Sequence, residues 1–327
     1  MAPAFRDVDL DEIDADDLTC VVTYRPQMGA LQRSIAHAGV LTPLHLRALD
    51  GRERLQLVSG WKRLLVCQQT GHLRVPALVY EVGELSDESA LLLAVYENLG
   101  CRSLNAVEKG RVLQRLRERF HYPDDELVKT WCPRLEIAPR LDGLEAHCTL
   151  MTLDESLQDG VITNALPLET ALWIGRQEAP DREVLLPLFT DLKLGQNRAR
   201  EFVSLIDEIC LRDGCGVVQL WEELGLADLL NNTALSAPQR VEALRHQLRT
   251  RRYPMLRAHE AQFEAARRQL RLPSQISLQP PPYFDGPEYQ VSFRFGSRES
   301  LAACAHKLLE SASTEALETM LRLLRCS

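Results

Sequence analysis

The nine residues LVSGWKRLL at positions 57–65 give the first indication of the fold. A short apolar run ends at Ser59 and Gly60, and two cations, Lys62 and Arg63, follow where a helix is predicted to begin. A glycine turn between a strand and a helix leaves backbone N–H groups free at the helix N-terminus, where they can bind phosphate. The stretch therefore predicts a strand, a phosphate-binding turn and a helix.

The residues on the N-terminal side of this stretch predict a helix followed by a hairpin. Leu31 and Ile35 lie at helical spacing, and a glycine at position 39 ends that pattern. TPLHLRAL at 42–49 alternates like a strand, and DGRE at 50–53 is typical of a turn before the second strand at 54–60.

The residues on the C-terminal side predict one more strand and then helices. VPALVYEV at 75–82 is the strand, and Ser86 is the expected N-cap of the helix that follows. Asn105 is the expected cap of the next helix, with Glu108 at the capping-box spacing.

The rest of the chain changes character twice. From about residue 105 to 270 almost only helices are predicted, the last of them beginning at Pro254. Residues 275–295 then predict two strands around a proline-rich turn, followed by a serine-capped helix. We therefore expect an α+β protein with three domains: an α+β head (1–104), an all-helical middle (105–235) and a small α+β end (236–327).

Composition limits the function classes. No apolar run reaches the roughly 18 residues needed to span a membrane, and the acidic N-terminus is unlike a signal peptide, so a cytoplasmic protein is expected. Nine scattered cysteines without a CxxC pair argue against a disulfide framework and a zinc ribbon. The net charge is −8, but residues 239–271 hold nine arginines against three glutamates.

Four motifs of the head resemble the ParB/Spo0J partition-protein family. They are GVLTP (39–43), VSGWKRLLV (58–66), VPALV (75–79) and ENLGCRSLNAVEKG (97–110), and their order and spacing agree with the family pattern. LMTLDESLQDGVITNALPLETALWI at 150–174 is similar to the family segment that follows its helix-turn-helix. The resemblance covers roughly residues 10–205 and implies a head with the fold that ParB shares with sulfiredoxin.

The resemblance implies a site for CTP and Mg²⁺ in the head, and at most slow CTP hydrolysis. Carboxylate and amide oxygens suit Mg²⁺, so Glu97 and Asn98 are the implied magnesium ligands. The implied nucleotide-binding residues are Thr42, Arg47, Gly60, Trp61, Lys62, Arg63, Glu97, Asn98 and Arg102.

The chain departs from the family pattern at two places, which makes it a divergent member. Trp61 stands where the family has glutamate, and Gly100 and Cys101 stand where it has Gln-Arg, so that the arginine comes one place late as Arg102. Trp61 either stacks on a base or ribose or packs in the core. Sulfiredoxin chemistry needs a reactive cysteine at the position of Trp61, and Cys67, further along the helix, is expected to be buried. Sulfiredoxin chemistry is therefore not expected.

A degenerate helix-turn-helix is expected between residues 124 and 153. Pro133 and Pro139 are predicted to break its two helices, and its candidate DNA contacts are Arg134, Arg140 and His147. Arg245, Arg249 and Arg252 lie on one face of a later helix and are the better electrostatic candidates. Alternatively, this face does not bind DNA: it is exposed to solvent, or it pairs with the acidic N-terminus of the same or a partner chain.

Together these features predict a ParB-like protein on double-stranded DNA, associated with the nucleoid in the cytoplasm. It would be a homodimeric CTP-binding clamp or regulator in chromosome or plasmid segregation or in transcription control, with a possible partner ATPase. An edge strand in the end domain favours the homodimer. The first alternative is a scaffold or adaptor that kept the fold without the chemistry, and the second is a metal-dependent nuclease.

Overall fold

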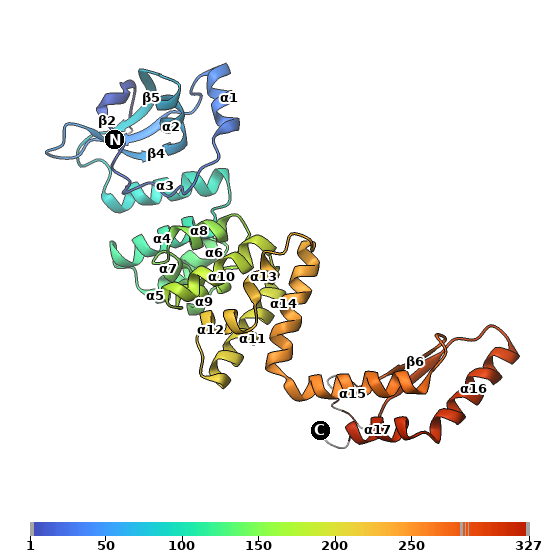
Figure 1. Cartoon of the computed structure of the whole chain (residues 1–327). Coiled ribbons are helices and arrows are strands. Elements are labelled where there is room, and N and C mark those ends of the chain that lie inside the picture. Colours follow the sequence, from blue (N-terminus) through green and yellow to red (C-terminus); the bar gives the residue numbers. More distant parts are fainter. Residues whose placement is uncertain (1–2, 282–283, 285, 287, 325–327) are drawn as a thin grey trace. The chain divides into compact units, whose positions relative to one another are not determined.

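The computed structural model describes residues 3–281, 284, 286 and 288–324, and confirms the α+β class (Figure 1). The chain divides into two compact units, Met1–Gln196 and Asn197–Ser327. The three-domain division at residues 104/105 and 235/236 stays a prediction. The Cys326 residue and the Arg257 side chain, both counted in the sequence, lie outside the described parts.

A five-stranded sheet of order β1-β5-β3-β4-β2 forms the first part of the N-terminal unit. The hairpin of β3 and β4 is antiparallel, as predicted, and β3 runs parallel to β5. Strand β1 pairs with β5 at the sheet edge, where the sequence had indicated only an acidic segment. The strands are β1 (Ala4–Asp9), β2 (Ile13–Asp14), β3 (Leu44–Arg47), β4 (Leu55–Ser59) and β5 (Arg74–Tyr80), with a 3-10 turn η1 (Leu10–Glu12) after β1.

Three helices accompany the sheet: α1 (Gly29–Ala38), α2 (Trp61–Gln69) and α3 (Asp87–Cys101). The Ser86 side chain accepts a hydrogen bond from the Ser89 N–H and caps α3, as predicted. Helix α3 packs on two sides. Ala90 and Ala94 contact the core around Val58 of the sheet, whereas Leu91 and Val95 belong to the core of the helices that follow.

The remainder of the N-terminal unit is helical. The predicted capping box of Asn105 and Glu108 is present at the start of α4. The elements are α4 (Ala106–Glu118), α5 (Asp124–Glu126), η2 (Leu127–Trp131), α6 (Cys132–Arg134), α7 (Leu141–Leu150), α8 (Glu155–Ile162), α9 (Leu168–Gly175) and α10 (Ala179–Leu192).

The prediction that Pro133 breaks a helix is wrong. Elements α5, η2 and α6 follow one another without interruption through Pro133, and η2 is a π-helical turn. A wider π turn accommodates a residue that a regular helix would exclude, so the proline ring and its missing N–H are tolerated near the helix end. Pro139 does lie in the turn before α7.

The second unit contains seven helices and a two-stranded sheet among its described residues. Helix α15 begins at Pro254, and β6 and β7 are antiparallel, both as predicted. Phe263, Leu278 and Met320 belong to the core of the end domain. The elements are α11 (Gln196–Asp213), which starts at the division, then α12 (Val217–Glu223), α13 (Leu226–Leu230), α14 (Ala237–Arg252), α15 (Pro254–Leu270), β6 (Ile276–Gln279), β7 (Gln290–Phe293), α16 (Arg298–Ala312) and α17 (Glu315–Leu323).

None of the helices in the described residues is both long and apolar enough to cross a membrane.

Candidate functional site

A cavity of about 320 Å³ lies in the N-terminal unit where β4 meets α2. This volume is within the range of small-molecule sites in proteins. Eight of the nine residues predicted to bind nucleotide line it: Thr42, Gly60, Trp61, Lys62, Arg63, Glu97, Asn98 and Arg102. The motifs at residues 39–43, 58–66 and 97–110 therefore meet at one place.

The turn into α2 depends on Gly60. Its φ is +109°, which residues with a side chain rarely adopt, and an added Cβ would lie 2.9 Å from the Leu44 Cγ atom. Gly60 is the N-cap of α2, and no side chain caps that helix end. The first N–H groups of α2 are thus left without a side-chain cap at the wall of the cavity.

Arg63 is held by the protein itself. Its guanidinium donates to the Thr42 carbonyl (2.8 Å), the Pro43 carbonyl (2.7 Å) and Glu97 Oε1 (2.7 Å). Its side chain is only 15% exposed. Arg63 therefore fixes the loop before β3 and neutralises Glu97.

Glu97 keeps one oxygen without a partner. Within the described parts of the chain, its buried Oε2 atom has no hydrogen bond. A buried carboxylate oxygen without a partner is costly, so it calls for a cation or a donor from a ligand. His45 and Tyr80 lie near Glu97, and burial, the larger cause, lowers the pKa of His45 while Glu97 opposes that shift.

Arg102 is also paired. It donates to both oxygens of Glu108, at 2.6 and 3.0 Å, and to Asn98 Oδ1 at 2.9 Å. Glu108 is 1% exposed and also accepts the Tyr24 N–H at 3.0 Å. The one-place shift of this arginine thus leaves its side chain on the cavity wall, tied to the first turn of α4.

Lys62 differs from both arginines. No hydrogen bond or ion pair of its ammonium is found among the described residues, although it lines the cavity. Burial lowers its pKa, and the charge of Arg102 contributes. Beside it, Trp61 is half-buried and packs against the sheet core while lining the cavity, so packing is one of its roles.

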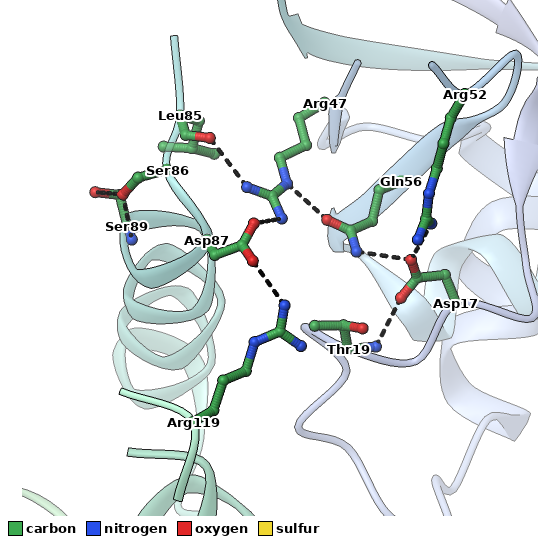
Figure 2. Close-up of polar contacts among 10 residues, drawn as sticks. All are labelled: Asp17, Thr19, Arg47, Arg52, Gln56, Leu85, Ser86, Asp87, Ser89 and Arg119. Carbon is green, nitrogen blue, oxygen red and sulfur yellow. Dashed lines mark hydrogen bonds and ion pairs between the residues drawn. The ribbon is translucent and has the colours of Figure 1, made fainter. Parts of the chain in front are cut away.

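Arg47 does not line the cavity. It is 2% exposed and donates to Gln56 Oε1 (2.6 Å), the Leu85 carbonyl (3.0 Å) and Asp87 Oδ1 (2.6 Å). Asp87 also accepts from Arg119, so Arg47 is the centre of a polar network that joins the hairpin to α3 and α4 (Figure 2). The prediction that Arg47 binds nucleotide is therefore corrected to a structural role.

The cavity also has a wall that the sequence analysis missed. Cys20, Val21, Val22 and Thr23 line it, and all four are buried. The apolar run between the acidic N-terminus and Pro26 was the one available signal. We call residues 18–24, which lie between β2 and α1, the strap.

The three residues predicted to contact DNA in the N-terminal unit have different surroundings. Arg134 is exposed, and its guanidinium carbon lies 5.2 Å from the centre of the Trp131 ring. It also donates a hydrogen bond to the Tyr96 hydroxyl at 2.7 Å. Arg140 is 72% exposed and lies 3.3 Å from Asp142. His147 is half-buried, its Nδ1 lies 2.8 Å from the Gly143 carbonyl, and burial lowers its pKa.

The arginines of α14 are used within their own unit. Arg245 pairs with Glu201 at 2.7 Å, and Arg252 pairs with Glu208 at 2.6 Å, both acids of α11. Arg249 also has an interaction partner. Arg245 and Arg252 thus pair with acids of α11, and not with the acidic N-terminus that was the predicted alternative.

The described residues lack a metal-ligating cluster, and their cysteines differ in exposure. No group of three or more His, Cys, Asp or Glu there could hold a metal ion. Cys67 is fully buried, as predicted, and burial raises its pKa. Cys101, in contrast, is exposed and lines the cavity.

Comparison with known proteins gives a consistent family for the first part of the chain. The model of the ParB N-terminal domain matches residues 4–99. A "Probable chromosome-partitioning protein ParB" of Pseudomonas putida is 34% identical over 98 residues, 30% of this chain and 32% of that protein. The protein of the same name from Neisseria meningitidis is 25% identical over 170 residues, 52% of this chain and 53% of that protein.

The comparison also matches two solved structures. The C-terminally truncated ParB of Caulobacter crescentus complexed to the centromeric parS site is 19% identical, covers 61% of this chain and 97% of that chain, and has a TM-score of 0.35. The same protein complexed with CTP-gamma-S is 22% identical, covers 57% and 98%, and has a TM-score of 0.27.

The chain spans between about a third and about half of the length of these two curated relatives. The matched part contains the sheet, the strap, the Gly60 turn and Glu97. Residues 4–99 thus match the ParB N-terminal domain, and this part of the chain is similar to chromosome-partitioning proteins of that name.

Proposed function

We propose that this chain is a CTP-binding, homodimeric ParB-type clamp or regulator that acts on double-stranded DNA in chromosome or plasmid segregation. The observation that carries the proposal is a pair of polar groups in the cavity that lack a direct partner. Among the described residues the Lys62 ammonium forms no hydrogen bond or ion pair, and the buried Oε2 atom of Glu97, whose Oε1 atom pairs with Arg63, has no hydrogen bond. A triphosphate with a divalent cation supplies the anion for the first and the cation for the second.

Magnesium fits Glu97 better than Asn98. The Glu97 Oε2 atom is available, whereas Asn98 Oδ1 already accepts a hydrogen bond from Arg102 and its amide donates to the Ala94 carbonyl. Mg²⁺ in nucleotide sites is usually held by one or two carboxylates together with phosphate oxygens and water. Glu97 would therefore be its protein ligand, and Asn98 would orient Arg102.

Calorimetry on the full chain tests the proposal. CTP is expected to bind in the presence of Mg²⁺ more tightly than ATP or GTP. Lys62→Ala should weaken CTP binding at least tenfold. Lys129→Ala is the matched control, because Lys129 is exposed and its one ion pair among the described residues is with Asp125 in the same helical stretch. If no nucleotide binds, or if both variants bind like the wild type, the proposal is rejected.

DNA binding is assigned to the helical pair 124–134 and 141–150, which a short turn joins as in a helix-turn-helix. Arg134 and Arg140, the proposed DNA contacts of this segment, are exposed, as is Lys129. Dimerisation is assigned to the end domain: α16 has 15 residues, of which only Cys304 and Ser311 are buried among those described. Exposed Phe295 and Leu309 lie beside and on this helix.

A scaffold or adaptor is the second candidate, and one observation favours it. Arg63 and Arg102, two of the three cations that line the cavity, are already neutralised by Glu97 and Glu108. A protein recovered by pull-down after nuclease treatment, from a chain that binds no nucleotide, would support this candidate. The same pull-down tests for a partner ATPase.

A further inference from the structure

Helix α11 ends in a turn that brings two cysteines of the second unit together. The Cys215 N–H donates a hydrogen bond to the Cys210 carbonyl at 3.2 Å, and Gly214 between them has a φ of +64°. This bond, combined with a glycine in the left-handed region, is the Schellman motif of helix ends. The side chains at the two ends of that motif frequently contact each other, and here both are cysteines.

Both cysteines are partly exposed. Cys210 and Cys215 are half-buried, whereas Cys67 and Cys132 are fully buried. Partial exposure distinguishes reactive thiols from structural ones. In redox-sensing proteins one accessible cysteine often attacks the oxidant and a second cysteine beside it then forms the disulfide. The end of α11 has the two residues that such a reaction needs.

A cation lies beside the pair. The Asp213 carboxylate is the main cause that raises the pKa of Arg212, and the Cys215 thiol contributes in the same direction. The Arg212 guanidinium therefore lies near the Cys215 sulfur. Reactive cysteines are found in partly exposed surroundings that contain a cation, because the thiolate is the nucleophile. Cys215 is thus the better candidate to attack an oxidant, and Cys210 is the second cysteine.

Helix α14 holds the turn between the two cysteines in place. Arg212 donates to the Arg252 carbonyl (2.8 Å) and to the Arg251 carbonyl (2.9 Å), at the end of α14. Asp213 in turn accepts a hydrogen bond from Arg251 Nε at 2.8 Å. Because the residues between the cysteines are fixed to a neighbouring helix, the two thiols stay adjacent in the folded chain. A bond between them then requires little further ordering of the backbone.

We propose that Cys210 and Cys215 form a reversible disulfide in response to hydrogen peroxide, which makes this turn a redox-sensing site. The Cys215 thiolate attacks a peroxide oxygen, so that an S–O bond forms, the O–O bond breaks, and the hydroxide that leaves takes up a proton as water. The Cys210 thiol then attacks the sulfur of this sulfenic acid: an S–S bond forms, the S–O bond breaks and a second water leaves. The two sulfurs are oxidised and the peroxide is reduced. A dithiol reductant reverses the reaction by thiol–disulfide exchange.

The inference is independent of the proposed function. Cys210 and Cys215 belong to the second unit and do not line the cavity beside Gly60. The redox site can therefore be tested without nucleotide or DNA.

Peptide mapping of the folded, full chain after peroxide treatment tests the inference. Trypsin cleaves after Arg212, between the two cysteines, so their disulfide joins peptides 201–212 and 213–240, which are otherwise separate. In the wild type, equimolar hydrogen peroxide followed by alkylation should give this joined product, and dithiothreitol should separate it again. Cys148→Ser is the matched control and should leave the product unchanged, because Cys148 is also half-buried but burial raises its pKa to about 11.

Two variants test the roles of the second cysteine and of the turn. In Cys210→Ser the joined product should be lost, and dimedone should trap the sulfenic acid at Cys215. Gly214→Ala should lower the yield of the joined product, because the left-handed conformation disfavours a side chain. An added Cβ at Gly214 meets nothing within 4 Å, so this variant is not expected to disturb the packing.

Three outcomes would overturn the inference. The first is a wild type in which both cysteines can still be alkylated after peroxide treatment. The second is a disulfide that joins two chains, seen as a covalent dimer on a non-reducing gel. The third is a Gly214→Ala variant that forms as much joined product as the wild type, since the turn would then not position the pair.

Discussion

At the scale of single residues, the cations that line the cavity have two roles. Two of them form ion pairs within the protein, and one is available to a ligand. Arg63 and Arg102 each form ion pairs of 2.7 Å or less with buried or half-buried carboxylates, whereas Lys62 has no such partner in the described chain. Arg47, equally plausible from sequence, is the most buried of these cations. A cation in a motif therefore becomes a ligand contact only where the fold leaves it unpaired.

Arg47→Met should lower the free energy of unfolding by about 3–5 kcal/mol, because it leaves Gln56, Asp87 and the Leu85 carbonyl without a buried partner. The matched change Arg52→Met, in the same network, should cost less than about 1 kcal/mol, since Arg52 is half exposed. Denaturant unfolding of both variants gives the comparison. Equal costs would contradict the central role of Arg47.

The cysteines of the cavity should react differently. Burial raises the pKa of Cys20 to about 11, so its thiol stays protonated and unreactive at pH 8. Cys101 is exposed, and we expect an alkylating reagent to modify it rapidly and CTP to slow that modification. Peptide mass spectrometry measures both rates. Rapid modification of Cys20 in the folded protein would show that the strap opens.

At the scale of elements, features that depend on residues close together in the sequence were predicted. Features that depend on partners far along the chain were missed. The caps of α3, α4 and α16 lie within three residues of the groups they bond, so Ser86, Asn105 and Ser297 were visible in the sequence. Strand β1 was missed because its partner β5 lies about 70 residues further along the chain. The strap was missed because its backbone bonds within the strap and to Arg111 and Arg115 of α4, and not to a neighbouring strand.

The same distinction applies to the candidate site: the positions of most of its residues were predicted, but roles that depend on distant partners were not. The motifs located eight cavity residues, because each motif is contiguous and the family order brings them together. The role of Arg47 depends on Asp87, 40 positions away, which no local pattern reveals. The pairing of Arg245 with Glu201, 44 positions away, was hidden for the same reason.

Two helical glycines provide a prediction about the contact of α4 with α7. Gly110→Ala should destabilise the protein by about 1–3 kcal/mol, because its Cβ would meet the His147 carbonyl and Met151. Gly100→Ala in α3 meets nothing within 4 Å and should stabilise it by up to about 1 kcal/mol. Thermal unfolding of the pair checks the opposite signs. A stabilised Gly110→Ala would mean that α4 and α7 are not in close contact.

At the scale of the whole molecule, acidic and basic residues are concentrated in different segments of the chain. The arginines of one such segment, α14, pair with acids of their own unit. The net charge of −8 combines an acidic N-terminal segment with an arginine-rich α14. Arg245, Arg251 and Arg252 of α14 are nevertheless matched by acids of the same unit. An arginine-rich segment is therefore weak evidence for DNA binding when acidic helices pack beside it.

The end domain should determine the oligomeric state. Sedimentation should show a dimer for the wild type and a monomer for the double variant Phe295→Lys, Leu309→Lys, which charges the exposed apolar residues of this domain. Leu211→Lys is the control, since Leu211 is 87% exposed on α11, outside the end domain. A double variant that remains dimeric would place the interface elsewhere.

The ion pairs between α11 and α14 have a kinetic consequence. Arg198–Glu242, Arg245–Glu201 and Arg252–Glu208 each join residues 44 positions apart, so the two helices run parallel in a fixed register. Parallel neighbours cannot be joined by a tight turn, and here the chain forms α12 and α13 on the way back. The entropy of closing that long loop must be overcome before any of these pairs forms, and a higher contact order slows folding. The parallel pairing of α11 and α14 is therefore expected to be among the last events in the assembly of its unit.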